Sequence, residues 1–313
     1  MSKAIATRNA YGEELLALGA ENQRIVVLDA DLTKSTMTAA FAAAFPQRFF
    51  NMGIAEADLM GTAAGMASMG LIAFASTFAI FATGRAYDQV RNTIAYAHLN
   101  VKIAATHAGL SVGEDGGSHQ ALEDIGLMRA LPGMTIIVPA DGDETRQAVR
   151  LAADWDGPVY LRLGRPAVPQ IHDADFVMQW GKAQVMRSGD AVCICATGHM
   201  TALALEAAAT LAEQGIAAEV INVPFIKPLD AETILASARK CGRVITAEEH
   251  SCYNGLGSAI AELLSEQAPC PLRRIAVQDS FGMSGKPAAV MAKYGLTAEA
   301  IADAAHAICN KGV

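Results

Sequence analysis

The feature that most constrains the fold is a repeated alternation of short apolar runs with longer segments of helical periodicity. In the first half, runs typical of buried strands occupy residues 25–28, 71–74, 101–104, 135–138 and 159–161. Helical patterns occupy residues 13–18, 55–69, 78–97 and 143–153. Near-continuous apolar strands that alternate with helices predict a parallel sheet covered on both faces.

A second alternation follows a looser stretch. Around residues 164–190 the pattern weakens and Pro166, Pro169 and Gly189 appear among several charges, which is typical of a domain linker. Beyond it, residues 192–196, 218–223 and 243–247 read as strands, and residues 201–214, 231–240 and 256–266 as helices. The sequence therefore predicts two doubly wound α/β domains, residues 1–170 and 189–313, joined by a linker at 171–188.

Composition narrows the class of protein. Hydrophobic residues make up 52% and charged residues 18%, which suits a globular chain with a large core. The net charge is −8 and no Lys/Arg cluster occurs, so nucleic acid is not an expected partner. The six cysteines form no C-x-x-C pair, and no Cys/His spacing fits a metal site.

The uncharged run at residues 59–84 is long enough to span a bilayer. It is rich in Gly, Ala, Ser and Thr, and Ser68-Met69-Gly70 interrupts it. We expect a buried helix, a turn, a short strand and the start of a second helix there instead. The N-terminus has no apolar segment of the signal-peptide kind, so we expect no membrane association and a cytoplasmic location.

Three segments carry residues suited to chemistry. The first, residues 51–58, places Glu56 and Asp58 at the start of an Ala/Gly-rich helix. These acids either complement the helix dipole or include a desolvated carboxylate suited to proton chemistry. The second, residues 76–81, places Phe78 and Phe81 on one helix face, either as core or as a platform for a flat ring.

The third segment, residues 106–120, follows a predicted strand and therefore lies where parallel sheets place ligands. It contains His107, His119, the acidic pair Glu114-Asp115 and four glycines. Glycines allow the backbone to approach a ligand closely, so this mixture favours a binding loop over a plain surface loop. Three arginines are candidates for binding an anionic group: Arg8, Arg162 and Arg165.

Together, these segments resemble the transketolase family in order and spacing over nearly the whole chain. Residues 53–56 resemble its catalytic glutamate motif, 76–81 its aminopyrimidine pocket and 113–120 its substrate loop. Residues 223–230 and Glu248-Glu249-His250 resemble landmarks of its C-terminal domain. The resemblance implies a pyrimidine-binding domain of the thiamine-diphosphate fold followed by a Rossmann-like transketolase C-terminal domain.

The resemblance also implies a role for each matching residue. Glu56 would form a hydrogen bond with N1′ of the pyrimidine ring of thiamine diphosphate and favour its 4′-imino tautomer. Glu56 and His119 are the expected catalytic residues. Phe78 and Phe81 would pack against the pyrimidine, and Asp31 would lie near the cofactor at a subunit interface. The implied substrate-binding residues are Asp115 for the acceptor aldose, His119 for the donor ketose, and Arg8, Ser35, His107 and Arg165 for the sugar phosphate.

Some positions depart from the family pattern. Gly84 stands where many full-length transketolases have an aromatic residue beside the pyrimidine, Gly117-Ser118 replaces Pro-Thr, and Ala108 replaces a polar residue. The printed sequence also lacks the Gly-Asp-Gly motif through which the family holds the diphosphate and Mg²⁺. The resemblance therefore implies a separate N-terminal partner chain that supplies Gly-Asp-Gly and a following Asn, in a heterotetramer with two chains of each kind.

Three other functions remain open from the sequence. One is the β subunit of a 2-oxo acid dehydrogenase, which the loop with Asp115 and His119 and the Arg8 and Arg165 pair disfavour. Another is a deoxyxylulose-phosphate synthase, which residues 85–89 resemble. The third is a regulatory paralogue without activity, which the presence of Glu56, Asp115 and His119 disfavours.

Overall fold

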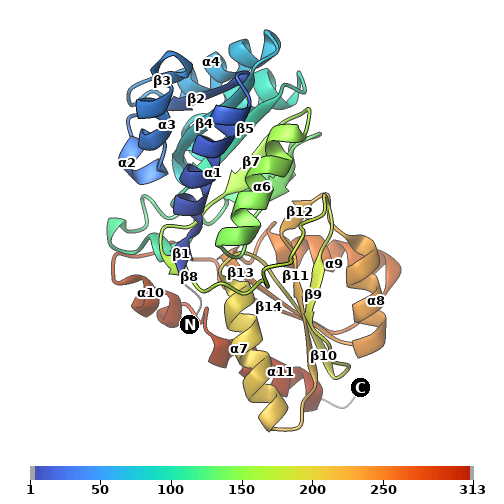
Figure 1. Cartoon of the computed structure of the whole chain (residues 1–313). Helices are drawn as coiled ribbons and strands as arrows, with labels where there is room; N and C mark the ends of the chain where they lie inside the picture. Colours follow the sequence, from blue (N-terminus) through green and yellow to red (C-terminus); the bar gives the residue numbers. More distant parts are fainter. Residues whose placement is uncertain (1–3, 311–313) are drawn as a thin grey trace.

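The computed structural model describes residues 4–310, and its two α/β domains lie one above the other in Figure 1. The first domain contains a seven-stranded sheet in the order β12-β6-β7-β5-β4-β2-β3. All neighbouring strands are parallel except β12, which pairs antiparallel with β6. The strands of this sheet are β2 (Ile25–Asp29), β3 (Phe49–Asn51), β4 (Ile72–Phe78), β5 (Val101–Thr106), β6 (Thr135–Ile137), β7 (Val159–Arg162) and β12 (Phe225–Lys227).

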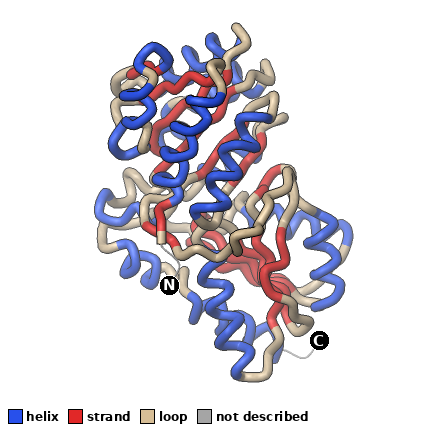
Figure 2. The backbone as a smooth tube through the Cα atoms, in the orientation of Figure 1, coloured by secondary structure: helices blue, strands red, loops and turns tan. Residues whose placement is uncertain are grey.

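Alternation along β2 explains why helices cover both faces of this sheet. Ile25 and Val27 pack with α1 and α6, whereas Val26 and Leu28 pack with α4 and η3. Figures 1 and 2 show α1 and α6 lying side by side across one face. The helices of this domain are α1 (Thr7–Glu21), α2 (Thr33–Thr36), α3 (Ala39–Ala44), η1 (Pro46–Arg48), α4 (Glu56–Ser68), η2 (Phe81–Arg85), η3 (Gln89–Ala95), η4 (Leu110–Asp115), α5 (Asp124–Arg129) and α6 (Gly142–Asp154).

The prediction of one helix over residues 78–97 was wrong in detail. Strand β4 continues through Phe78, and the chain then forms two π-helical segments, η2 and η3. Phe78 and Phe81 therefore do not share a helix face, although their rings stack. The prediction of a helix, a turn, a strand and a helix start over residues 59–84 is confirmed.

The second domain repeats the same architecture with a smaller sheet, in the order β14-β13-β10-β11-β9. Only β9 is antiparallel to its neighbour. Strand β9 lies within the range predicted as the linker. The elements are β9 (Gln184–Arg187), β10 (Val192–Ala196), β11 (Ala218–Asn222), β13 (Val244–Ser251), β14 (Leu272–Val277), α7 (Met200–Glu213), α8 (Ala231–Cys241), α9 (Leu256–Gln267), α10 (Pro287–Lys293) and α11 (Ala298–Asn310).

The two domains are closely joined. Strand β12 comes from the second half of the chain but pairs with β6 at the edge of the first sheet. A two-stranded ribbon of β1 (Ile5–Ala6) and β8 (Ala167–Val168) lies between the domains in Figure 1. One core cluster contains Ile136 and Val138 of the first domain together with Cys195 and Ile221 of the second. Within residues 4–310, no helix combines the length and apolar character needed to cross a membrane.

Candidate active site

The candidate site lies at the carboxyl edge of the first sheet. Strand β2 leads to Asp31 and Ser35, β3 to Glu56, β4 to Phe78 and Phe81, β5 to His107 and the loop at residues 110–120, and β7 to Arg165. The carboxyl ends of parallel strands meet along one edge, which is where open α/β sheets bind ligands. The fold therefore gathers side chains that lie far apart in the sequence.

Glu56 is the first residue of α4 and is only 1% exposed. Arg85, at the end of η2, donates from Nη1 to both Glu56 carboxylate oxygens, at 2.8 and 2.9 Å. The Arg85 side chain is 52% exposed, so the pair has a buried acid and a solvated base. The first-turn position of Glu56 fits the helix dipole, and its burial also fits the interpretation as a functional carboxylate.

An aromatic surface lies beside this ion pair. The Phe78 and Phe81 rings are stacked, with centroids 5.9 Å apart and planes inclined by 11°. The Arg85 guanidinium carbon lies 4.5 Å from the Phe81 ring centroid. A flat group that donates N–H bonds thus already lies between the aromatic face of Phe81 and the carboxylate of Glu56. An aminopyrimidine is also flat and, when protonated on its ring nitrogen, offers an N–H donor, so the residues fit that ring once Arg85 has moved.

Sequence reasoning did not place Arg85 in the site. It is the first charged residue after the uncharged run of residues 59–84, which was the available signal. Gly84, the departure from the family pattern at the position beside the pyrimidine, faces open space: a Cβ added there would meet nothing within 4 Å beyond its own chain neighbours and helix backbone.

The two histidines of the third segment border the same aromatic pair. The His107 ring stacks on Phe78 with centroids 3.9 Å apart. The centroid of the His119 ring lies 5.4 Å from that of Phe81 and 6.2 Å from that of Phe78, with its plane steeply inclined to both. Burial, followed by the nearby Arg8 and Arg165, lowers the pKa of His107 to about 3. His107 is therefore neutral at physiological pH and acts as a hydrogen-bonding group rather than as a cation.

Two guanidinium groups lie on the other side of His107. Arg8 Nη1 lies 3.4 Å from Nε2 of His107 and donates to the Ser35 carbonyl oxygen at 3.0 Å. Arg165 pairs with Glu114 at 3.0 Å and also donates to the Val112 carbonyl oxygen. Burial, followed by the charge of Arg165, lowers the pKa of Arg8. Because these cations repel one another, an anion bound between them would relieve the repulsion.

Of the remaining predicted residues, two are exposed at the edge of this site and one is buried away from it. Asp115 is exposed at the end of η4, and Asp31 is exposed after β2, where it accepts a bond from Asn51 at 3.0 Å. Arg162, one of the three candidate cations, is instead buried against Asp124, with Nε 2.7 Å from Oδ2. It is therefore not available to a substrate anion.

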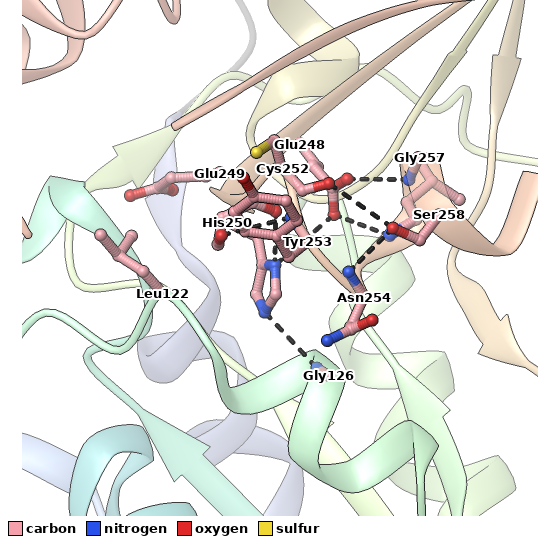
Figure 3. A network of polar contacts seen from close by, with 12 residues as sticks. Leu122, Gly126, Glu248, Glu249, His250, Cys252, Tyr253, Asn254, Gly257 and Ser258 are labelled. Atoms are coloured by element: carbon pink, nitrogen blue, oxygen red, sulfur yellow. Dashed lines mark hydrogen bonds and ion pairs between the residues drawn. The ribbon is translucent and has the colours of Figure 1, made fainter. Parts of the chain in front are cut away.

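The landmarks of the second domain connect it to the first. The Glu248 carboxylate accepts bonds from the backbone N–H groups of Leu256 and Gly257 at the start of α9. Figure 3 shows Glu249 pointing to the opposite side, as expected for neighbours in a strand. The backbone N–H of Gly126 approaches Nε2 of His250 at 3.5 Å, which connects α5 to β13. Among residues 4–310, no group of three or more His, Cys, Asp or Glu side chains could hold a metal ion.

Comparison with known proteins agrees with this geometry. Residues 3–170 match the transketolase pyrimidine-binding domain, and residues 181–301 match the transketolase C-terminal domain. The chain belongs to the transketolase family. Its two domains are the pyrimidine-binding and C-terminal domains of that thiamine-diphosphate-dependent family. The family, the fold and the resemblance predicted from the sequence are thereby confirmed.

Similar proteins are named as sections or subunits of transketolases. A candidate transketolase C-terminal section of Methanocaldococcus jannaschii is 46% identical over 298 residues, covering 94% of this chain and 93% of its own length. The 6-deoxy-6-sulfo-D-fructose transketolase subunit SqwH of a Clostridium species is 44% identical, covering 97% and 94%. A solved split-gene transketolase, an inactive β4 tetramer, has a TM-score of 0.90 at 53% identity, covering 98% and 99%.

Proposed function

We propose that this chain is the C-terminal subunit of a two-chain transketolase that transfers a two-carbon ketol unit between a ketose phosphate and an aldose phosphate. The observation that carries this proposal is the pair formed by Glu56 and Phe81, both of which contact the planar N–H donor of Arg85. The same edge of the sheet carries the Arg8, His107 and Arg165 cluster. A site for a flat cofactor ring beside a site for an anion suits a thiamine enzyme acting on charged sugars.

Each group of residues has a separate task in this proposal. Thiamine diphosphate, when bound, supplies a nucleophilic carbon and an electron sink for cleaving the ketose. Glu56 would hold a proton at the pyrimidine ring, in a buried position where water competes weakly for the hydrogen bond. Phe78 and Phe81 would orient the ring, and Asp31 would lie at the cofactor edge. His119, which lies beside both rings, would bind the donor ketose.

The cationic cluster would bind the charged end of the sugar. Arg8 and Arg165 would bind the anionic group, and the neutral His107 would contribute a hydrogen bond without adding repulsion. Ser35 would hold Arg8 through its carbonyl oxygen, and Asp115 would meet an acceptor hydroxyl. The sulfonated ketose in the name of the Clostridium relative also has an anionic end, so phosphate and sulfonate sugars should both be assayed.

We also propose that a partner chain supplies the diphosphate-binding domain and the Mg²⁺ ligands in an α2β2 assembly. A β4 tetramer of the split-gene relative is inactive, which is consistent with a need for that partner. The outward side of α4 has small residues at Ala57, Gly61 and Gly65. An added Cβ at either glycine would meet nothing within 4 Å, and Ile54 nearby is 78% exposed. Small residues at a four-residue spacing allow a helix of another chain to approach closely.

Co-expression with a chain that carries Gly-Asp-Gly tests the whole proposal. The pair, supplied with thiamine diphosphate and Mg²⁺, should transfer a ketol unit from a ketose phosphate to an aldose phosphate, and either chain alone should not. A Gly61→Leu chain should fold but fail to co-purify with the partner. A stable pair active only on 2-oxo acids, or one forming deoxyxylulose phosphate, would instead support one of the alternative thiamine enzymes.

A further inference from the structure

The loop of residues 110–120 is held by a segment of the second domain, residues 279–287. Glycines on both sides make this contact close. A Cβ added to Gly113 would lie 2.8 Å from Pro287 Cγ, and one added to Gly117 would lie 2.8 Å from the Gly282 carbonyl oxygen. Such distances are shorter than ordinary van der Waals contacts, so the two segments are fitted to each other at backbone level.

Gln120 is the centre of this contact. Its side chain is buried, and Nε2 lies 3.2 Å from the Leu110 carbonyl oxygen, 3.3 Å from that of Gly113 and 2.9 Å from that of Met283. The first two carbonyls belong to η4, and the third belongs to the second domain. One amide group therefore fixes the fold of the loop and attaches it to the neighbouring domain.

Two further bonds attach the loop to the second domain. Ser284 Oγ donates to the Glu114 carbonyl oxygen at 2.5 Å, directly before Asp115. The Ser111 backbone N–H donates to Glu249 Oε1 at 2.5 Å. Because His119 immediately precedes Gln120, the anchored amide also sets the direction in which the His119 ring leaves the backbone.

We propose that Gln120 is a positioning residue, which holds His119 and Asp115 in place through the second-domain segment at residues 279–287. This inference rests on the proposed ketol transfer for its functional meaning. The second domain then has a direct part in sugar binding, although none of its residues needs to touch the sugar. A displacement of about 1 Å in a substrate-positioning group can reduce turnover by about 100-fold, so a small loosening of this anchor should be measurable.

Two variants should disrupt the contact between Gln120 and residues 279–287, one by changing Gln120 and the other by changing Gly282. Gln120→Met keeps the approximate volume but removes the N–H donors. Gly282→Ala leaves the loop sequence intact, but its Cβ would lie 1.8 Å from Gln120 Oε1 and must displace that amide. Gln278→Met is the matched control, because Gln278 is exposed directly before this segment and donates to the Ala276 carbonyl oxygen.

The measurements use the assembled pair. For both anchor variants, we expect kcat/KM for donor and acceptor sugars to fall by about tenfold or more. The affinity for thiamine diphosphate, the partner affinity and the Tm should stay close to wild type. Hydrogen–deuterium exchange should accelerate in residues 110–120, and the control should match wild type throughout.

Unchanged sugar kinetics together with unchanged exchange would overturn the inference. It would equally be overturned if cofactor affinity and Tm fell in proportion to the sugar kinetics, because Gln120 would then have only a general structural role. A wild-type pair without ketol-transfer activity would instead count against the proposed function. The exchange measurement would still decide whether the second domain anchors the loop.

Discussion

Two arginine–carboxylate pairs in the first domain have the same chemistry but different surroundings. Asp124 and Arg162 are 0% and 6% exposed, and their bidentate contact is supplemented by the Tyr160 hydroxyl, which donates to Asp124 at 2.7 Å. In the other pair, Glu56 is 1% exposed whereas Arg85 is 52% exposed. The Asp124–Arg162 pair is buried on every side, and we call it the enclosed pair. The Glu56–Arg85 pair has one partner that solvent can replace, and we call it the open pair.

The electrostatics of the enclosed pair show why it is permanent. Burial raises the pKa of Asp124, but the charge of Arg162 and the hydrogen bonds from Arg162 and Tyr160, acting with other nearby groups, together hold that pKa below its usual range. Arg162 also donates to the Glu249 carbonyl oxygen at 3.0 Å, so the pair connects the two domains. A charged group that is hydrogen-bonded on all sides has a structural role. A carboxylate that shares its only counterion with water can exchange that counterion for a ligand.

The largest expected effect is on catalysis. In the co-expressed pair, Glu56→Gln should reduce ketol transfer by a factor of about 10² to 10⁴, the range for loss of a positioned acid–base group. The fold should be retained, because Gln keeps the shape of the side chain. Initial rates with saturating cofactor measure the effect, and Glu266→Gln, on the exposed side of α9, serves as the control. A Glu56→Gln pair as active as wild type would remove Glu56 from the mechanism.

The enclosed pair should give the largest effect on stability. Asp124→Asn leaves the buried Arg162 without its counterion, and we expect a loss of about 3–5 kcal/mol in the free energy of unfolding. Glu56→Gln should cost less than about 1 kcal/mol, because the Arg85 side chain that it leaves unpaired is half solvated. Chemical denaturation of the two variants measures the difference. Equal losses would show that exposure does not distinguish the two pairs.

The sequence predicted much of this arrangement, but not the open pair. Continuous apolar runs identify β2, β4 and β5, and parallel strands bring Phe78 and His107 to one edge. Glu56 reaches the same edge after β3, a three-residue strand that the sequence did not predict. Strand β12 was not predicted, because its partner β6 lies in the other half of the chain. Strand β14 was not predicted, because its Arg273-Arg274 pair interrupts the apolar pattern. The Arg85 contact depends on the π-helical path of η2, which residue periodicity does not encode.

Lys102 is another buried basic residue, and backbone carbonyl oxygens rather than a carboxylate accept its hydrogen bonds. Lys102 donates to the carbonyl oxygens of Trp155 and Gly157, both at 2.7 Å, and burial lowers its pKa to about 7. The folded chain therefore releases a proton between about pH 7 and pH 10 that the unfolded chain still holds. Stability from this residue rises with pH through that window.

Lys102→Met should remove this rise. Relative to the variant, wild type should gain up to about 1.4 kcal/mol of unfolding free energy per pH unit between pH 7 and pH 10. Denaturation curves at several pH values measure the slope, and the exposed Lys34→Met gives the baseline. Parallel slopes for wild type and Lys102→Met would mean that Lys102 stays protonated throughout.

The smallest expected effect tests the open pair itself. If a cofactor ring must displace Arg85 from Glu56, then Arg85→Met removes a competitor and thiamine diphosphate should bind more tightly. An ion pair whose base is half exposed, as Arg85 is, contributes about 1 kcal/mol or less, so the Kd should fall by about fivefold at most.

Calorimetric titration of the assembled pair measures this Kd, with Arg91→Met on η3 as the matched control. A faster rate of cofactor association in the variant would agree with a displaced side chain. Weaker binding would mean that Arg85 remains in the loaded pocket and holds the cofactor. Both arginine–carboxylate pairs would then be permanent, and their difference in exposure would reflect only the missing partner chain.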